Sequence, residues 1–275
     1  MDLIEILKVV ILGIVEGITE WLPISSTGHM LLVDEFIKMN VSDAFKEMFF
    51  VVIQLGAILA VIILFWKRMW PFGINEQKKV YAKKDIWSMW FKVVVACIPG
   101  TVVTLLFDDW IDEHLKTPTV IAICLIFYGV AFIVIEAWNK TRTPKTEQLS
   151  DITYRIAFII GCFQVLSIIP GTSRSGATII GALLIGVSRV AAAEFTFFMA
   201  VPVMVGLSMI KVLKFGFDFT GTELATLGIG CVVAFLVSVV VIKFFMSYIK
   251  KHSFSVFGVY RILLGIAVLA YFSFS

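Results

Sequence analysis

Six long apolar stretches constrain this chain more than any other feature of its sequence. Five of them, at residues 48–66, 87–107, 119–138, 224–245 and 256–272, approach the roughly 20 residues that cross the hydrocarbon core of a bilayer. The sixth, at residues 195–210, is shorter and contains Pro202, but it still predicts a span. Because a bilayer interior offers no partner to an unpaired backbone group, we expect an all-α polytopic membrane protein with about six transmembrane helices.

The composition supports a membrane protein. Of the 275 residues, 60% are hydrophobic and only 16% are charged, which leaves too little polar surface to coat a soluble globule. The formal net charge of +3 says little by itself. We expect the lipid bilayer as a partner and no nucleic acid, and the sequence leaves the oligomeric state open.

The distribution of basic residues predicts the orientation. If residues 3–34 and 156–187 each enter and leave the membrane on one side, the loops between the spans alternate between the two faces. One face then holds an acidic loop (Asp108, Asp109, Asp112 and Glu113) and few basic residues (Lys8, Lys38, Lys46, Lys116, Lys211 and Lys214). The other face holds most of the 23 basic residues and is cytoplasmic by the positive-inside rule, so both termini are expected outside. Its members are Lys67, Arg68, Lys78, Lys79, Lys83, Lys84, Lys92, Lys140, Arg142, Lys145, Arg155, Arg189, Lys243, Lys250 and Lys251.

The chain also shows signs of an internal duplication. A shift of 147 positions aligns three pairs without a gap: Pro23 with Pro170, Ser26 with Ser173, and Glu47 with Glu194. Residues 1–140 and 150–275 would then each contain one interrupted hairpin followed by three spans. Because three is odd, the second copy is inverted relative to the first, and the two repeats together form one membrane domain.

Each repeat begins with an apolar segment that is interrupted by a similar run of residues. Residues 23–29 read Pro-Ile-Ser-Ser-Thr-Gly-His, and residues 170–176 read Pro-Gly-Thr-Ser-Arg-Ser-Gly. Proline ends a helix, and Ser or Thr favours the start of the next. We therefore expect two re-entrant helical hairpins, each with a half-helix N-terminus that attracts anions inside the membrane. The alternative is a pair of kinked helices packed through small residues.

Two carboxylates precede the first break. Glu16 and Glu20 are four residues apart, so they share one face of a helix directly before Pro23. Oxygen ligands of this kind suit Mg²⁺ or Ca²⁺, with substrate phosphates completing the coordination. The alternative is that both glutamates face water at a helix end.

The breaks also contain candidates for phosphoryl-transfer chemistry. His29 lies three residues after Ser26, close enough on a first helical turn to pair as base and nucleophile. Arg174 offers a planar fork that binds phosphate oxygens bidentately, or alternatively serves as the structural partner of a glutamate. Arg174 and Arg261 both lie within apolar sequence, where a charge is costly and is a functional candidate by default.

At these residues the chain resembles the bacterial undecaprenyl-diphosphate phosphatases, whose loss or excess alters bacitracin sensitivity. That family has an E-x-x-x-E segment before a P-x-S-S-T-G-H turn, and a second segment P-G-x-S-R-S-x-x-T. Here they are Glu16 to Glu20, Pro23 to His29, and Pro170 to Thr178. The resemblance in length, span number and repeat plan covers the whole chain.

The resemblance implies a bacterial plasma (inner) membrane enzyme that hydrolyses undecaprenyl diphosphate to undecaprenyl phosphate and inorganic phosphate. The prenyl diphosphate lipid would enter a site open to the outer face, and the reaction would depend on a divalent cation, Mg²⁺ or Ca²⁺. The product is the lipid carrier of cell-wall synthesis. A transporter or flippase of an anionic prenyl lipid is the alternative, because inverted repeats with broken helices are also a transporter plan.

The resemblance also implies roles for individual residues. Glu16 and Glu20 would bind metal or diphosphate, with Ser26 as nucleophile and His29 as its base or proton shuttle. Ser25, Thr27 or a metal-bound water remain alternative nucleophiles. The expected catalytic residues are Ser26, His29, Glu20 and Arg174, and the expected substrate-binding residues are Ser25, Thr27, Thr172, Ser173, Arg174 and Ser175.

Overall fold

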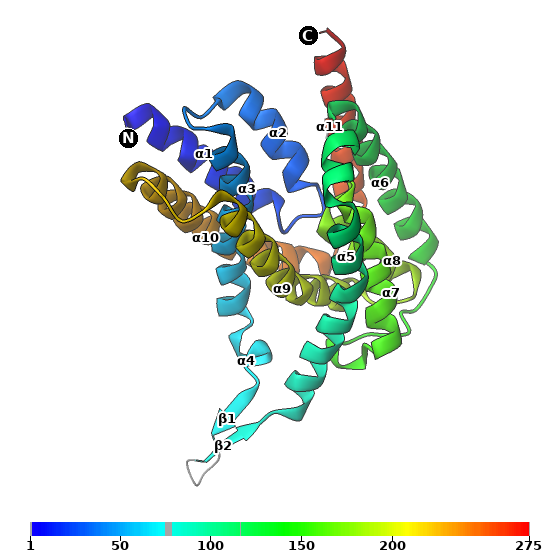
Figure 1. Ribbon diagram of the computed structural model, residues 1–275. Helices are drawn as coiled ribbons and strands as arrows, with labels where there is room; N and C mark the ends of the chain where they lie inside the picture. The colour runs from blue at the N-terminus through cyan, green and yellow to red at the C-terminus, as the bar shows by residue number, and fades with distance from the viewer. Residues whose placement is uncertain (1, 75–78, 116, 275) are drawn as a thin grey trace.

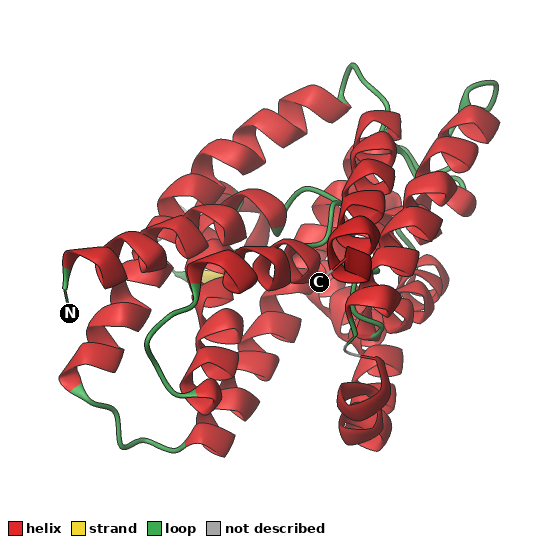
Figure 2. Ribbon diagram, turned by 90° about the horizontal axis from the view of Figure 1, so that it is seen from above, coloured by secondary structure: helices red, strands yellow, loops and turns green. Residues whose placement is uncertain are grey.

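Long helices make up nearly all of the protein (Figures 1 and 2). The computed structural model describes residues 2–74, 79–115 and 117–274. Of the residues used to predict the topology, Lys78 and Lys116 lie outside this part, and so do the side chains of Asp108, Asp109, Asp112 and Glu113.

The prediction of six membrane spans is confirmed within the described residues. Six helices are long and apolar enough to cross a bilayer: α3 (Asp43–Leu64), α5 (Lys84–Leu115), α6 (Pro118–Asn139), α9 (Arg189–Phe215), α10 (Gly221–Ile249) and α11 (Ser255–Phe274). Four of these six helices follow a Ser or Thr capping residue. Ser42, Thr117, Ser188 and Thr220 each precede a span, and each side chain accepts a hydrogen bond from a backbone N–H in the first turn.

The interrupted segments form two helix pairs. The first consists of α1 (Leu3–Thr19) and α2 (Ser26–Ile37). The second consists of α7 (Tyr154–Val165), the 3-10 turn η2 (Leu166–Ile168) and α8 (Arg174–Leu184). Two further short helical turns, α4 (Trp66–Met69) and η1 (Leu149–Asp151), lie in connections.

Two local expectations are wrong. The sequence predicts a loop at the acidic residues 108–113, but α5 continues to Leu115. No glycine or proline follows Gly100 in this helix, and the His114 ring donates through Nδ1 to the Trp110 carbonyl at 2.9 Å. The connection between α4 and α5 also contains a two-stranded antiparallel hairpin, β1 (Phe72–Ile74) and β2 (Val80–Ala82), which an all-α prediction omits.

The spans pack closely through glycines. A Cβ atom on Gly56 of α3 would lie 2.1 Å from the carbonyl oxygen of Cys231 in α10. A Cβ atom on Gly161 of α7 would lie 2.1 Å from the carbonyl oxygen of Ala96 in α5. Only glycine permits these backbones to approach so closely. α1 also packs on α10 and α7 on α5, and the two breaks lie close enough for one side chain, Arg261, to bond to both.

Candidate active site

The two breaks use the same backbone device. Ser25 has φ 74° and Ser173 has φ 73°, and they are the two non-glycine residues with positive φ in the described part of the chain. Each caps the following helix: the Ser25 hydroxyl accepts from Gly28 N at 3.3 Å, and the Ser173 hydroxyl accepts from Gly176 N at 3.2 Å. Strained conformations of this kind persist only where the surroundings hold them.

This geometry pairs the caps of the two breaks differently from the ungapped sequence alignment. The residue that corresponds to Ser173 is Ser25, whereas the ungapped alignment paired Ser173 with Ser26. The difference arises because the second break has one more residue between its proline and its cap. Ser26, the first residue of α2, therefore corresponds to Arg174, the first residue of α8.

Arg261 of α11 holds both breaks in place. Its side chain is fully buried. It donates to the carbonyl of Pro23 in the first break at 3.1 Å, and to those of Gly171 and Thr172 in the second at 2.8 Å each. A buried charge is tolerated when hydrogen-bond acceptors surround it, so the guanidinium bridges two segments that are far apart in sequence.

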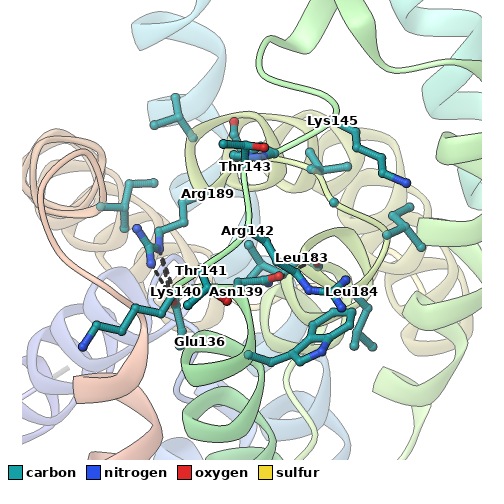
Figure 3. A pocket seen from close by; sticks show the side chains of 18 of the residues that line it. Glu136, Asn139, Lys140, Thr141, Arg142, Thr143, Lys145, Leu183, Leu184 and Arg189 are labelled. Atoms are coloured by element: carbon teal, nitrogen blue, oxygen red, sulfur yellow. Dashed lines mark hydrogen bonds and ion pairs between the residues drawn. The ribbon is translucent and has the colours of Figure 1, made fainter.

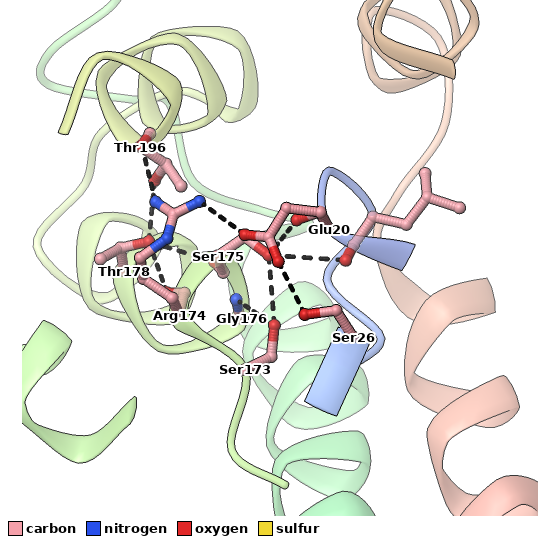
Figure 4. Close-up of polar contacts among 9 residues, drawn as sticks. Glu20, Ser26, Ser173, Arg174, Ser175, Gly176, Thr178 and Thr196 are labelled. Atoms are coloured by element: carbon pink, nitrogen blue, oxygen red, sulfur yellow. Dashed lines mark hydrogen bonds and ion pairs between the residues drawn. The ribbon is translucent and has the colours of Figure 1, made fainter. Parts of the chain in front are cut away.

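Glu20 joins the two breaks on the other side. Its Oε2 accepts a hydrogen bond from the Ser26 hydroxyl at 2.7 Å, and its Oε1 accepts one from Arg174 Nη2 at 3.1 Å. Figure 4 shows the carboxylate between these two side chains. Both members of the ion pair are mostly buried, with side-chain exposures of 5% for Glu20 and 11% for Arg174. The sequence predicted a role for each residue, and the structure brings the three into direct contact.

Arg174 keeps donor capacity for a ligand. Its Nη1 donates to the Thr196 carbonyl at 3.0 Å, but its buried Nε has no hydrogen-bond partner. Beside it, the hydroxyls of Ser173 and Ser175 lie 3.2 Å apart. Unpaired buried donors are rare in folded proteins, so this corner is suited to a phosphate oxygen.

The hydrogen bonds of His29 are to residues other than Ser26, Glu20 and Arg174. Its Nδ1 is 2.7 Å from the Ser25 carbonyl oxygen, which only accepts, so Nδ1 carries a proton. In the neutral ring Nε2 is then the acceptor, and it receives the Tyr260 hydroxyl at 2.7 Å. Neither contact is with Ser26, which donates to Glu20 instead. Tyr260 could not be predicted as this partner, because it follows His29 by 231 positions.

The donors that the sequence predicts for a cation are the two glutamates, Glu16 and Glu20. Glu16 is buried, and its Oε1 has no hydrogen-bond partner. No cluster of three or more His, Cys, Asp or Glu side chains that could hold a metal occurs among the described residues. Two carboxylates, one with an unpaired oxygen, fit a hard cation that takes its remaining ligands from water and substrate phosphate.

A cavity of about 470 Å³ opens beside this cluster. Of the predicted site residues, those that line it are Glu20, Ser26, Thr27, Ser173 and Arg174; those that do not are Glu16, Ser25, His29, Thr172 and Ser175. Its apolar lining includes Leu105 of α5 and residues of α9 between Pro202 and Ile210, while Thr101 and Thr104 of α5 add hydroxyls. The cavity therefore has one polar end and one apolar side.

Sequence reasoning missed two amides that line this cavity, Gln54 and Gln164. Gln164 is 5% exposed, and its Oε1 has no hydrogen-bond partner. A buried polar side chain within an apolar segment is itself a signal of function, and it was available at this position. Because this oxygen only accepts, it suits a water or a cation bound with the ligand, not a phosphate oxygen, and a buried acceptor without a partner costs stability.

Replacing Gln164 with leucine tests this assignment. Gln164→Leu should keep or raise the thermal unfolding midpoint in detergent, because it removes an unpaired buried amide. For the prenyl diphosphate expected from the sequence, kcat/KM should fall about tenfold or more, because the amide oxygen no longer holds a water or cation beside the diphosphate. Wild-type kcat/KM in a stable variant would show that the amide plays no part in binding the substrate.

Arg261→Lys should disrupt both breaks, because lysine keeps the charge but lacks the fork that reaches several carbonyls. We expect the free energy of unfolding to fall by about 3 kcal/mol or more, as buried acceptors lose their donors, together with loss of activity. Arg155→Lys, at an exposed position of α7, is the matched control and should behave as wild type. An unchanged unfolding midpoint in Arg261→Lys would contradict the bridging role.

Comparison with known proteins gives a consistent set of relatives. The family model described as "Bacitracin resistance protein BacA" matches residues 9–267. A protein of Enterococcus faecalis named "Undecaprenyl-diphosphatase" is 71% identical over 269 residues, which cover 98% of each chain. Proteins with the same name from Lachnoclostridium phytofermentans and Desulfitobacterium hafniense are each 61% identical and cover 99% of this chain and 98% of the relative.

Proposed function

The chain belongs to the bacitracin resistance protein BacA family, and we propose that it hydrolyses undecaprenyl diphosphate at the junction of its two breaks. The products are undecaprenyl phosphate and inorganic phosphate, so the enzyme recycles the lipid carrier used in cell-wall synthesis. The observation that carries this proposal is the contact of Ser26 with Glu20 and of Glu20 with Arg174. These contacts bring together a hydroxyl nucleophile, a carboxylate base and a guanidinium that can bind phosphate.

The first step follows from these contacts. Ser26 Oγ attacks the terminal phosphorus, the bridging P–O bond breaks, and undecaprenyl phosphate leaves. Glu20 accepts the Ser26 proton, since its Oε2 already accepts that hydrogen bond at 2.7 Å. Arg174, with its unpaired Nε, binds the transferring phosphoryl group. Glu20 then passes the Ser26 proton to the departing undecaprenyl phosphate and is again a carboxylate. Water attacks the phosphoserine, Glu20 takes the proton of the water and returns it to Ser26 Oγ, and inorganic phosphate is released.

The other assigned residues bind and position. Ser173 and Thr27 line the cavity and are placed to donate to phosphate oxygens. Ser25 and Thr172 shape the breaks, and Ser175 supports Ser173. His29 fixes the first turn of α2 through the Ser25 carbonyl, and it is a positioning residue in this scheme.

Glu16 and Glu20 are the residues that would hold Mg²⁺ or Ca²⁺. When bound, such an ion offsets negative charge on the diphosphate oxygens. Glu16 Oε1 is free for this purpose, whereas both oxygens of Glu20 already accept hydrogen bonds.

The helix contacts support an inverted repeat of residues 1–140 and 150–275 in one membrane domain. Two pairs of equivalent spans meet, α3 with α9 and α6 with α11. The first helix of each broken pair packs on the second span of the other repeat, α1 on α10 and α7 on α5. Reciprocal contacts of this kind are expected when a two-fold axis in the membrane plane relates the two repeats. Both broken pairs are then re-entrant, and each presents its half-helix N-terminus to the substrate.

The basic residues support an orientation in the bacterial plasma membrane. The termini lie away from the β1–β2 hairpin (Figure 1), whose neighbours include Lys67, Lys83 and Lys84. By the positive-inside rule that hairpin is cytoplasmic. The termini and the opening of the active site then lie on the outer face, where the lipid diphosphate enters with its tail along the apolar side of the cavity.

Phosphate release from purified protein tests this function. Wild-type protein should release phosphate from C55 diphosphate in the presence of Mg²⁺ or Ca²⁺, and less after chelation. Ser26→Ala and Glu20→Gln should each reduce turnover by several orders of magnitude. Because the two groups act as one unit, the double variant should be hardly worse than Ser26→Ala alone.

Two results would count against the assignment. Losses that multiply in the double variant would separate Glu20 from Ser26, and substantial activity in Ser26→Ala would point to another nucleophile. Lys243→Gln, at an exposed position remote from the cavity, is the control and should be fully active. A parallel assay with C15 diphosphate measures what the long tail contributes.

A further inference from the structure

A second cavity, of about 780 Å³, lies away from the active site (Figure 3). It shares no lining residue with the active-site cavity. The end of α6, the segment 140–145, the end of α8, the start of α9 and the end of α10 surround it. Since α8 begins at Arg174 and ends at Leu184, the two cavities lie at opposite ends of this helix, about 15 Å apart.

Positive charge dominates the second cavity. Its basic lining residues are Lys140, Arg142, Lys145, Arg189 and Lys250, and its one acidic lining residue is Glu136. Glu136 already accepts hydrogen bonds from Arg189 Nε at 2.9 and 3.1 Å and from the Phe254 backbone N–H at 2.9 Å. The other four cations form no ion pair with any residue in the described part of the chain.

The walls of this cavity are fixed. The Arg142 guanidinium lies over the Trp138 ring, 3.6 Å from its centroid, which leaves the edges of the fork free to bind an anion. The connecting segment is tied to the turn before α9, because Lys145 N donates to the Gly186 carbonyl at 2.8 Å and Ser188 N to the Thr146 carbonyl at 2.9 Å. Figure 3 shows Lys140 and Lys145 at opposite edges of the opening.

The surroundings point to a lipid rather than a soluble anion. Three membrane spans begin or end at this cavity, so it lies at the level of a bilayer surface. Trp138 and Leu184 are 43% and 37% exposed there, and exposed tryptophans favour the headgroup region. Basic pockets between spans on the cytoplasmic side are typical binding places for anionic headgroups.

We propose that this cavity binds the phosphate headgroup of an anionic phospholipid from the cytoplasmic leaflet. The free lysines and Arg142 neutralise the phosphate, and the acyl chains follow the exposed apolar surface beside Trp138 and Leu184. A zwitterionic lipid binds less well, because its ammonium or choline group meets the same cations.

Thermal unfolding of delipidated protein in a non-ionic detergent tests this site. Phosphatidylglycerol should raise the unfolding midpoint of wild type, and phosphatidylcholine should not. In the variant Lys140→Gln/Arg142→Gln/Lys145→Gln, about tenfold or more phosphatidylglycerol should be needed for the same rise. The control Lys67→Gln/Lys84→Gln/Lys243→Gln removes three exposed charges of the same predicted face outside the cavity, and it should respond as wild type.

An inorganic-phosphate arm separates the two sources of the anion. If inorganic phosphate raises the unfolding midpoint of the cavity variant as it does that of wild type, the phosphate binds at the active site, and the proposal stands. A rise that is lost in that variant identifies a free-anion site and overturns the lipid assignment. The proposal also fails if the cavity variant responds to phosphatidylglycerol as wild type does, or if the control loses the response equally.

A second measurement needs no variant. A photoreactive phosphatidylglycerol, cross-linked to wild-type protein and mapped by peptide mass spectrometry, should label residues 138–145 or 183–190. Labelling confined to other segments would overturn the proposal.

Discussion

The buried guanidinium of Arg261 is the contact on which the active site depends. The helices at the two breaks end in buried surroundings, where each backbone carbonyl needs a donor because water does not reach it. Arg261 supplies donors to Pro23, Gly171 and Thr172 at once. Since these residues precede the caps Ser25 and Ser173, one side chain fixes the position of both caps and the direction of both following helices.

This arrangement explains why neither half of the chain contains the site alone. The first break contributes Ser26 and Glu20, and the second contributes Arg174, which meets Glu20 across the junction. The carboxylate serves both partners, because one oxygen accepts from the hydroxyl and the other pairs with the guanidinium. In the proposed mechanism a diphosphate that binds Arg174 is placed against Ser26, and its lipid tail follows the apolar side of the cavity.

The sequence predicts local features well and long-range contacts poorly. The six spans follow from apolar length, and the breaks follow from Pro23 and Pro170 with their caps, because these signals lie within a few residues. The pairing of Ser26 with His29 was inferred from their spacing. In the structure Ser26 donates to Glu20, and His29 Nε2 accepts from Tyr260, and spacing predicts neither contact. The one-residue offset between the breaks became visible only with the backbone path. Gln164 stands out in the sequence as a polar residue in an apolar segment, but only the structure shows that its Oε1 is buried without a partner.

The central claim is that Ser26, activated by Glu20, attacks the terminal phosphorus. The most direct test is to mix the enzyme with undecaprenyl diphosphate that carries a radioactive terminal phosphate, and to quench with acid on the millisecond scale. The account predicts a transient phosphoserine at Ser26, found by peptide mapping, that is absent in Ser26→Ala and Glu20→Gln. Phosphate release at the normal rate with no labelled protein at any time, or label on a residue other than Ser26, would contradict it.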